Sequence, residues 1–95
     1  MRFEEKRKNR DLITNICNEN NVDTKLNKNT INRIPYREFM SKIEFLKEKN
    51  ISLLDKTGKL HEIFSMSNTN MKQKYNITLE ELIDNYYIKG KEKGN

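Results

Sequence analysis

The sequence predicts a small α+β domain with three helices, a two-stranded β-hairpin and an added C-terminal helix, in a chain of 95 residues. Apolar residues recur at helical spacing along residues 35–49. Two apolar stretches flank a polar turn at residues 55–59, which is typical of a hairpin. At this length we expect one domain, with a polar N-terminal segment over about residues 1–9 and a frayed C-terminal tail over about residues 89–95.

The N-terminal third of the chain predicts two helices of modest amphipathicity. The first covers residues 3–20 and should end within the asparagine-rich stretch 18–21. Its apolar stripe consists of Leu12, Ile13, Ile16 and Cys17. The second is a short helix within residues 25–32, which Asp23 or Thr24 would cap.

The strongest helical pattern begins at Pro35, a residue suited to the first turn of a helix, and should stop near residues 49–50. The core-facing stripe consists of Tyr36, Phe39, Met40, Ile43 and Leu46. The opposite face carries Arg37, Ser41, Glu44, Phe45 and Glu48. Phe45 on that outward face indicates a dimer contact, a contact with the last helix, or a misplaced helical wheel.

The predicted hairpin covers residues 51–66. Asp55 and Gly58 occupy the first and fourth positions of a type I turn, and Gly58 would supply the positive φ of a following bulge. His61 is interpreted as a surface residue of the second strand. The turn itself exposes two lysines around a threonine.

The C-terminal part predicts a loop at residues 67–70, a helical turn at residues 71–75 and then a longer helix that ends at Gly90. Thr78 and Glu81 have the spacing of a capping box, in which each side chain meets a free backbone N–H of the first turn. The two hydrophobic staple positions around this box hold Ile77 and Leu82.

The composition excludes several classes of function. We expect no enzyme, metal or cofactor, because the sequence lacks a phosphate-binding glycine loop, Cys/His metal spacing and a nucleophile paired with its base. Cys17 is the only cysteine and is expected to be a buried, inert thiol. Neither a secretory signal nor a membrane-spanning run is evident, which predicts a cytoplasmic protein without a membrane partner. The net charge of +5 suits a polyanion, and the abundance of Asn, Lys and Ile indicates an AT-rich genome.

The predicted order of helices and hairpin resembles the winged helix-turn-helix family of DNA-binding proteins, over about residues 10–66. The resemblance implies a fold in which residues 35–49 form the recognition helix and residues 51–66 form the wing. It also implies double-stranded DNA as the partner.

The residues themselves shift the expected contact toward the wing. Glu44 and Glu48, with Glu38 at their margin, would repel phosphates from the outer face of the third helix. Lysines at the turn and basic or aromatic residues near the start of that helix are better suited to DNA. The predicted DNA-binding residues are Lys28, Arg33, Tyr36, Arg37, Lys56, Thr57 and Lys59.

These observations predict a DNA-binding accessory protein of an AT-rich bacterium, its plasmid or its phage, acting in transfer-origin recognition, partition or transcriptional control. We expect a homodimer, and a protein partner in a nucleoprotein complex is a further expectation. The alternative is a non-enzymatic protein-binding module, such as a phage inhibitor or assembly adaptor, that uses Phe45 or the Tyr86–Tyr87 end. A variant of the DNA hypothesis places a helix-turn-helix within residues 71–87, although its second helix begins with acidic residues.

Overall fold

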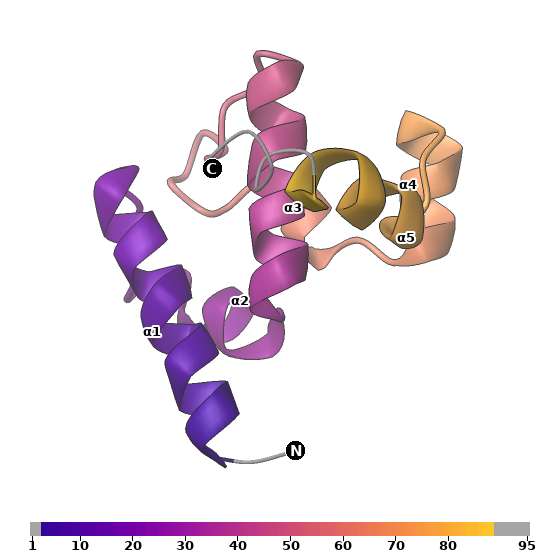
Figure 1. Cartoon of the computed structure of the whole chain (residues 1–95). Helices are drawn as coiled ribbons and strands as arrows, with labels where there is room; N and C mark the ends of the chain where they lie inside the picture. Colours follow the sequence, from indigo (N-terminus) through magenta and orange to yellow (C-terminus); the bar gives the residue numbers. More distant parts are fainter. Residues whose placement is uncertain (1–2, 89–95) are drawn as a thin grey trace.

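The computed structural model describes residues 3–88 of the chain, and in that range the fold is a set of helices (Figure 1). The α-helices are α1 (Phe3–Glu19), α2 (Lys28–Arg33), α3 (Tyr36–Glu48), α4 (Asn68–Tyr75) and α5 (Leu79–Leu82). A 3₁₀-helix, η1 (Glu62–Ser65), precedes α4, and a π-helix, η2 (Ile83–Ile88), continues α5. The predicted frayed tail at 89–95 lies outside the described residues.

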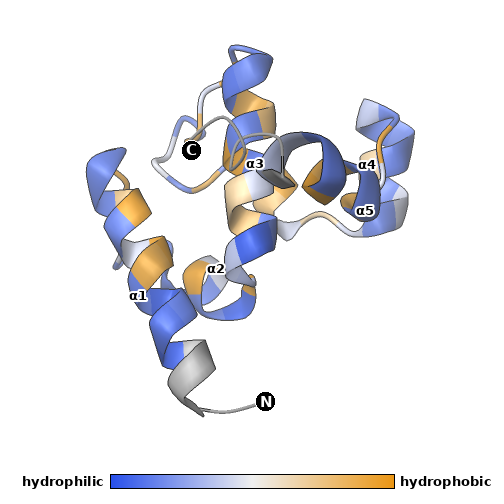
Figure 2. Ribbon diagram, viewed as in Figure 1, coloured by the Kyte–Doolittle hydropathy of each residue, from blue (hydrophilic) through white to orange (hydrophobic). Residues whose placement is uncertain are grey.

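Helix α3 forms the centre of the molecule. Figure 1 shows α1 and α2 on one side of it and α4 and α5 on the other. The hydrophobic segments of the α1 ribbon face α2 and α3 (Figure 2), and Ile13 and Cys17 of α1 are buried. On α3, Phe39 packs against Phe64 of η1 with a ring separation of 5.0 Å. The core therefore surrounds α3 instead of lying along one of its faces.

The ends of the first and third helices lie where the sequence predicts them. Asparagine adopts the left-handed conformation at Asn21, Asn50 and Asn76, with φ near 60° at each. This conformation closes the last helical turn, and Asn tolerates it better than most residues that carry a side chain. The predicted stops of the first and third helices are thus confirmed. The predicted start of α3 is also confirmed, with Pro35 immediately before its first residue.

The predicted two-stranded hairpin is wrong, and with it the α+β winged-helix fold. The described residues contain a single isolated antiparallel bridge, between Leu54 and Leu60, and no strand. The turn between these two residues is present. The N–H of Gly58 donates to the carbonyl of Asp55 at 3.1 Å, and Gly58 has the expected positive φ of 90°.

The ladder stops because its next hydrogen-bonding groups are already engaged. Extension beyond the bridge requires the His61 carbonyl as an acceptor for the opposite strand. That carbonyl instead accepts the N–H of Phe64 at 3.0 Å, within η1. His61 Nδ1 accepts the N–H of Ile63 at 3.1 Å and so caps η1. His61 is therefore a helix cap and not a surface strand residue.

The C-terminal helices confirm the capping box and correct the loop before it. Thr78 Oγ1 accepts the N–H of Glu81 at 3.2 Å, and the Glu81 carboxylate accepts the N–H of Thr78 at 3.0 Å. Residues 68–70 were expected in a loop but form the first turn of α4, where Ser67 Oγ accepts the N–H of Asn70. Serine is a favoured cap residue, so the cap explains the earlier start of α4.

Candidate nucleic-acid interface

The side chain of Asn27 joins two turns that are distant in the sequence. Its Oδ1 accepts the N–H of Leu60 at 2.7 Å, and its Nδ2 donates to the carbonyls of Gly58 at 3.3 Å and Asp23 at 2.8 Å. Asn27 is 4% exposed. Hydrogen bonds to buried backbone groups are costly to lose, so this carboxamide fixes residues 23–28 against residues 55–60.

The surface around this contact carries four exposed lysines, and we call it the lysine surface: Lys25, Lys28, Lys56 and Lys59. Lys25 lies in the turn before α2, and Lys28 is the first residue of α2. The other two belong to the 55–59 turn, on either side of Thr57 and Gly58. A Cβ placed on Gly58 would lie 3.4 Å from Leu26 Cδ2, which confirms how closely the two turns approach.

The two aspartates of the lysine surface are occupied by the turns themselves. Asp23 Oδ1 accepts the N–H groups of Lys25 and Leu26. Asp55 Oδ1 accepts the N–H and hydroxyl of Thr57 at 2.8 and 2.7 Å and the N–H of Lys59 at 3.1 Å. The hydrogen bonds from Thr57 are the main reason why the pKa of Asp55 is lowered. Both carboxylates therefore stabilise the backbone of their own turns. The four positive lysines outnumber the two negative aspartates, so this surface has a net positive charge.

One of the two residues predicted to cap the second helix, Asp23, caps a different segment. Asp23 caps the turn at residues 24–27, and α2 begins three residues later than predicted, at Lys28. The side chain of the residue before α2, Asn27, makes no cap hydrogen bond with the helix, because it is used for the contact with the 55–60 turn.

The structure brings together Lys28, Lys56, Thr57 and Lys59 of the predicted DNA-binding residues, whereas it places the other three at the start of α3 or beside it. Arg37 is exposed and lies over the Tyr87 ring, 5.4 Å from its centroid. Tyr36 is half-buried and meets the same ring edge-on at 6.3 Å. Burial, followed by the nearby Tyr87 hydroxyl, raises the pKa of Tyr36.

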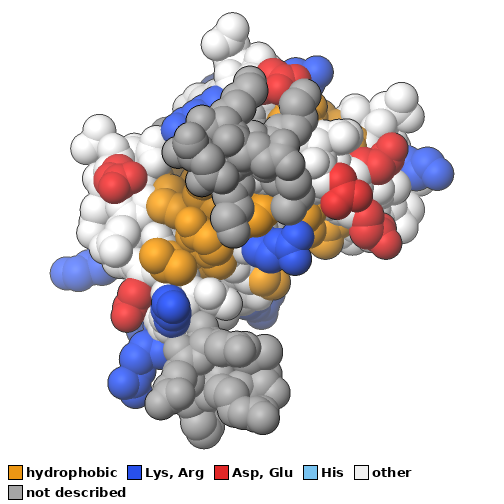
Figure 3. Space-filling model, in the orientation of Figure 1, with side chains coloured by type: hydrophobic (Ala, Val, Ile, Leu, Met, Phe, Trp, Pro, Cys, Tyr) orange, Lys and Arg blue, Asp and Glu red, His pale blue; other side chains and the backbone are white. Residues whose placement is uncertain are grey.

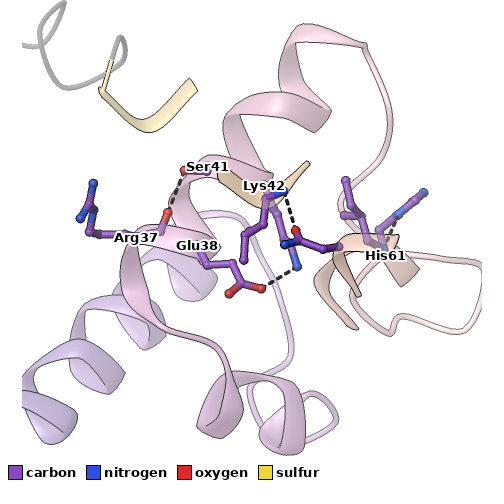
Figure 4. Close-up of polar contacts among 8 residues, drawn as sticks. Arg37, Glu38, Ser41, Lys42 and His61 are labelled. Atoms are coloured by element: carbon purple, nitrogen blue, oxygen red, sulfur yellow. Dashed lines mark hydrogen bonds and ion pairs between the residues drawn. The ribbon is translucent and has the colours of Figure 1, made fainter. Parts of the chain in front are cut away.

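Arg33 ends α2 and contributes to an open groove of about 360 Å³ between α2, the start of α3 and η1. Its apolar lining consists of Ile34, Pro35, Phe64 and Met66. Glu38 also borders the groove and forms an ion pair with Lys42 at 2.8 Å. Figure 4 shows Lys42 extending back along α3 to this carboxylate.

Lys42 is a charged side chain that is fully buried, with 0% exposure. Burial lowers its pKa, and the hydrogen bond and charge of Glu38 act in the opposite direction. The neighbouring Ser41 is equally buried, and its hydroxyl donates to the Arg37 carbonyl at 2.9 Å (Figure 4). Side chains on both sides of α3 are therefore buried by its neighbours, whereas the recognition helix of a winged domain would present one face outward.

Phe45 contacts the last helix, which was one of the three predicted explanations for its position. It is 2% exposed and packs edge-to-face against Tyr75 of α4 at 5.4 Å and Tyr86 of η2 at 5.3 Å. Tyr86 also donates its hydroxyl to Glu48 at 3.3 Å. Phe45 is thus part of the core, and its side chain is unavailable as the surface of a protein-binding module.

The charges are distributed unevenly over the face seen in Figure 3, where carboxylates gather over α4 and α5. Exposed acidic residues at the start of α5 and in η2 are Glu80, Glu81 and Asp84. Helices α4 and α5 are joined by a short turn, as the helix-turn-helix variant requires, but the acidic surface of the second helix is unfavourable for phosphates. Within residues 3–88 the structure contains no cluster of metal-ligating side chains and no helix that could cross a membrane.

Sequence reasoning missed Asn27, the residue that assembles the lysine surface, and with it Lys25. In the sequence Asn27 is one of several asparagines in the polar stretch 18–32. Asn27 does not belong to an apolar repeat of helical or strand spacing. Its partners across the two turns are backbone groups 31 and 33 positions away, so no local pattern indicates its role. The lysines of the 55–59 turn were found because their turn has a local signature.

Comparisons with protein-family models, curated proteins and solved structures give no significant match for this chain.

Proposed function

We propose that this protein binds double-stranded DNA through the lysine surface, using phosphate contacts from the two turns that Asn27 joins. The observation that carries the proposal is the pairing of these turns, which gathers four exposed lysines that are separated in sequence by up to 34 positions. Lysines neutralise phosphates by releasing bound counterions, and a cluster of them gives an affinity that falls steeply with salt. The overall charge of +5 supports the same partner.

The contacts around the four lysines are compatible with phosphate binding. The two aspartates of the surface are held by backbone N–H groups, so neither is seen in an ion pair with these lysines. The two turns are held together, because Asn27 forms hydrogen bonds with the Gly58 carbonyl and the Leu60 N–H. Exposed lysines on two turns that are held together suit a partner whose charges repeat along a regular backbone.

The experiment is a salt titration of binding to a fluorescent 30-bp duplex, followed by anisotropy. In the Lys56→Ala/Lys59→Ala variant the slope of log K against log salt should become shallower by about 2, since each phosphate contact contributes about 0.9. The matched control is Lys47→Ala/Lys72→Ala, which removes the same charge from exposed positions on α3 and α4.

The control variant should lose less affinity and keep most of the wild-type slope, because its lysines lie outside the lysine surface. An equal loss in both double variants would mean that net charge alone controls binding and would refute the assigned surface. Absence of duplex binding by the wild-type chain at low salt would refute the function itself. The cellular role, whether transfer-origin recognition, partition or transcriptional control, and the homodimer both remain predictions from the sequence.

A further inference from the structure

We infer that α2 is the element that reads the DNA bases, an inference that rests on the proposed function and adds sequence specificity to it. The exposed side chains of α2 belong to Lys28, Asn29, Asn32 and Arg33. At about 100° per residue they occupy one arc of roughly 140° on the helix. Ile31 and the following Ile34 lie on the opposite side, and both are buried.

The chemistry of this arc suits base edges as well as phosphates. An asparagine carboxamide can donate to and accept from adenine in the major groove, and an arginine guanidinium can donate two hydrogen bonds to guanine. Helix α2 contains no carboxylate. The exposed end of α3 carries Glu48, and the start of α5 carries Glu80 and Glu81. Among the helices of the described residues, α2 and α4 lack carboxylates, and of these two only α2 also carries a guanidinium group.

The position of α2 also fits, because it begins at the residue that follows Asn27. The lysine surface is therefore fixed at the N-terminal end of α2, where phosphates bordering a groove would be met while the helix faces the bases. Helix α1 packs beside α2 (Figure 1). Its exposed cations Arg7, Lys8 and Arg10 supply further phosphate contacts. An α-helix about 10–12 Å in diameter fits a major groove about 12 Å wide, and the six residues of α2 would extend about 9 Å within it.

The test is selection from a pool of duplexes with 20 randomised base pairs, using the full chain, followed by sequencing of the retained DNA. The wild-type protein should enrich a short motif. The Asn32→Ala/Arg33→Ala variant should lose that enrichment, with the ratio of affinities for motif and random duplex falling at least about tenfold, the discrimination expected of bidentate base contacts. Its thermal unfolding should match that of the wild type, because both side chains are exposed.

Two other variants separate the possible outcomes. Lys56→Ala/Lys59→Ala should bind more weakly while enriching the same motif, since phosphate contacts carry no sequence information. Asn18→Ala/Lys47→Ala removes one amide and one ammonium group from exposed sites on α1 and α3 and should change neither property. Retention of duplexes without a motif, or an unchanged motif in Asn32→Ala/Arg33→Ala, would overturn the inference. Retention of no duplex at all would instead refute the proposed function.

Discussion

Asn27 and Leu60 are joined by a hydrogen bond of 2.7 Å from the Leu60 N–H to the Asn27 Oδ1, and this bond holds the two lysine-bearing turns together. Both residues are buried, at 4% and 8% exposure. The contact explains how the turn at residues 55–59 is held in place, although residues 3–88 contain one isolated β-bridge and no strand.

Replacement of Asn27 by alanine should lower the free energy of unfolding by about 1–3 kcal/mol, because it leaves the buried N–H of Leu60 without an acceptor. Urea unfolding followed by circular dichroism measures the change. The control is Asn32→Ala, an exposed asparagine of the neighbouring helix, whose effect should stay within about 0.5 kcal/mol. Equal stability of the two variants would show that the contact is energetically unimportant.

Replacement of Phe45 by alanine should cost about 3–5 kcal/mol, the range for removal of a buried aromatic ring. The Phe45 ring of α3 packs against α4 and η2. The substitution removes its two edge-to-face contacts, with Tyr75 and Tyr86. Leu26→Ala serves as the control, since Leu26 is 46% exposed. Both variants are measured in the same denaturation assay. If Phe45→Ala lowers the free energy of unfolding no more than Leu26→Ala does, the conclusion that Phe45 belongs to the core is wrong.

The Glu38–Lys42 pair should respond unequally to removal of its two members. Glu38→Ala leaves the ammonium of a fully buried lysine without its carboxylate and should cost about 3–5 kcal/mol. Lys42→Met should cost less, because the Glu38 side chain is 19% exposed and can be hydrated. Chemical denaturation at neutral pH measures both, and a larger loss for Lys42→Met would contradict this explanation.

The same pair predicts how the Glu38→Ala variant depends on pH. Burial lowers the pKa of Lys42 below the value of 10.5 that it has in the unfolded chain. Between the two values the unfolded state binds more protons, so the free energy of unfolding rises with pH. The deficit of Glu38→Ala relative to the wild type should therefore shrink as the pH approaches 10.5. Parallel denaturation curves at pH 7 and pH 10 measure it, and an unchanged deficit would argue against a charged, buried Lys42.

The buried Cys17 thiol should make the free energy of unfolding fall as the pH rises, which is the opposite sign to the effect of Lys42. Burial raises the pKa of its thiol from 9.0 to about 11. Its contribution to stability is complete below pH 9, because the thiol is protonated in both states, and is lost as the pH rises through about 11. Relative to Cys17→Ala, the wild type should lose about 2–3 kcal/mol over this interval, since one unit of pKa corresponds to 1.36 kcal/mol. An identical pH profile for the two proteins would show that the thiol ionises freely in the folded state.

Much of the helical structure was predictable because its signals are local. The capping box at Thr78 and Glu81 involves residues three positions apart, and Asn50 ends α3 by its own backbone conformation. The turn at Asp55 and Gly58 is equally local. Such features depend on neighbours within one turn of chain, and a sequence displays those neighbours directly.

The errors arise where distant residues decide the outcome. The alternation of apolar residues after Leu60 favours a strand, but the His61 carbonyl is used within η1. A helical wheel for α3 assumes that one face meets solvent, whereas α4 and η2 cover the side that holds Phe45. The candidate DNA-binding set was found in part, because lysines mark exposed turns while the asparagine that unites them resembles its neighbours.

The hydrogen bond between Asn27 and Leu60 also gives the lysine surface a natural reporter. Backbone amides exchange with deuterium when their hydrogen bonds open, so exchange at the Leu60 amide measures the fraction of molecules in which the two turns have separated. A ligand that contacts both turns binds only the joined state. It must slow that exchange in proportion to its occupancy, even where the rest of the chain exchanges at an unchanged rate.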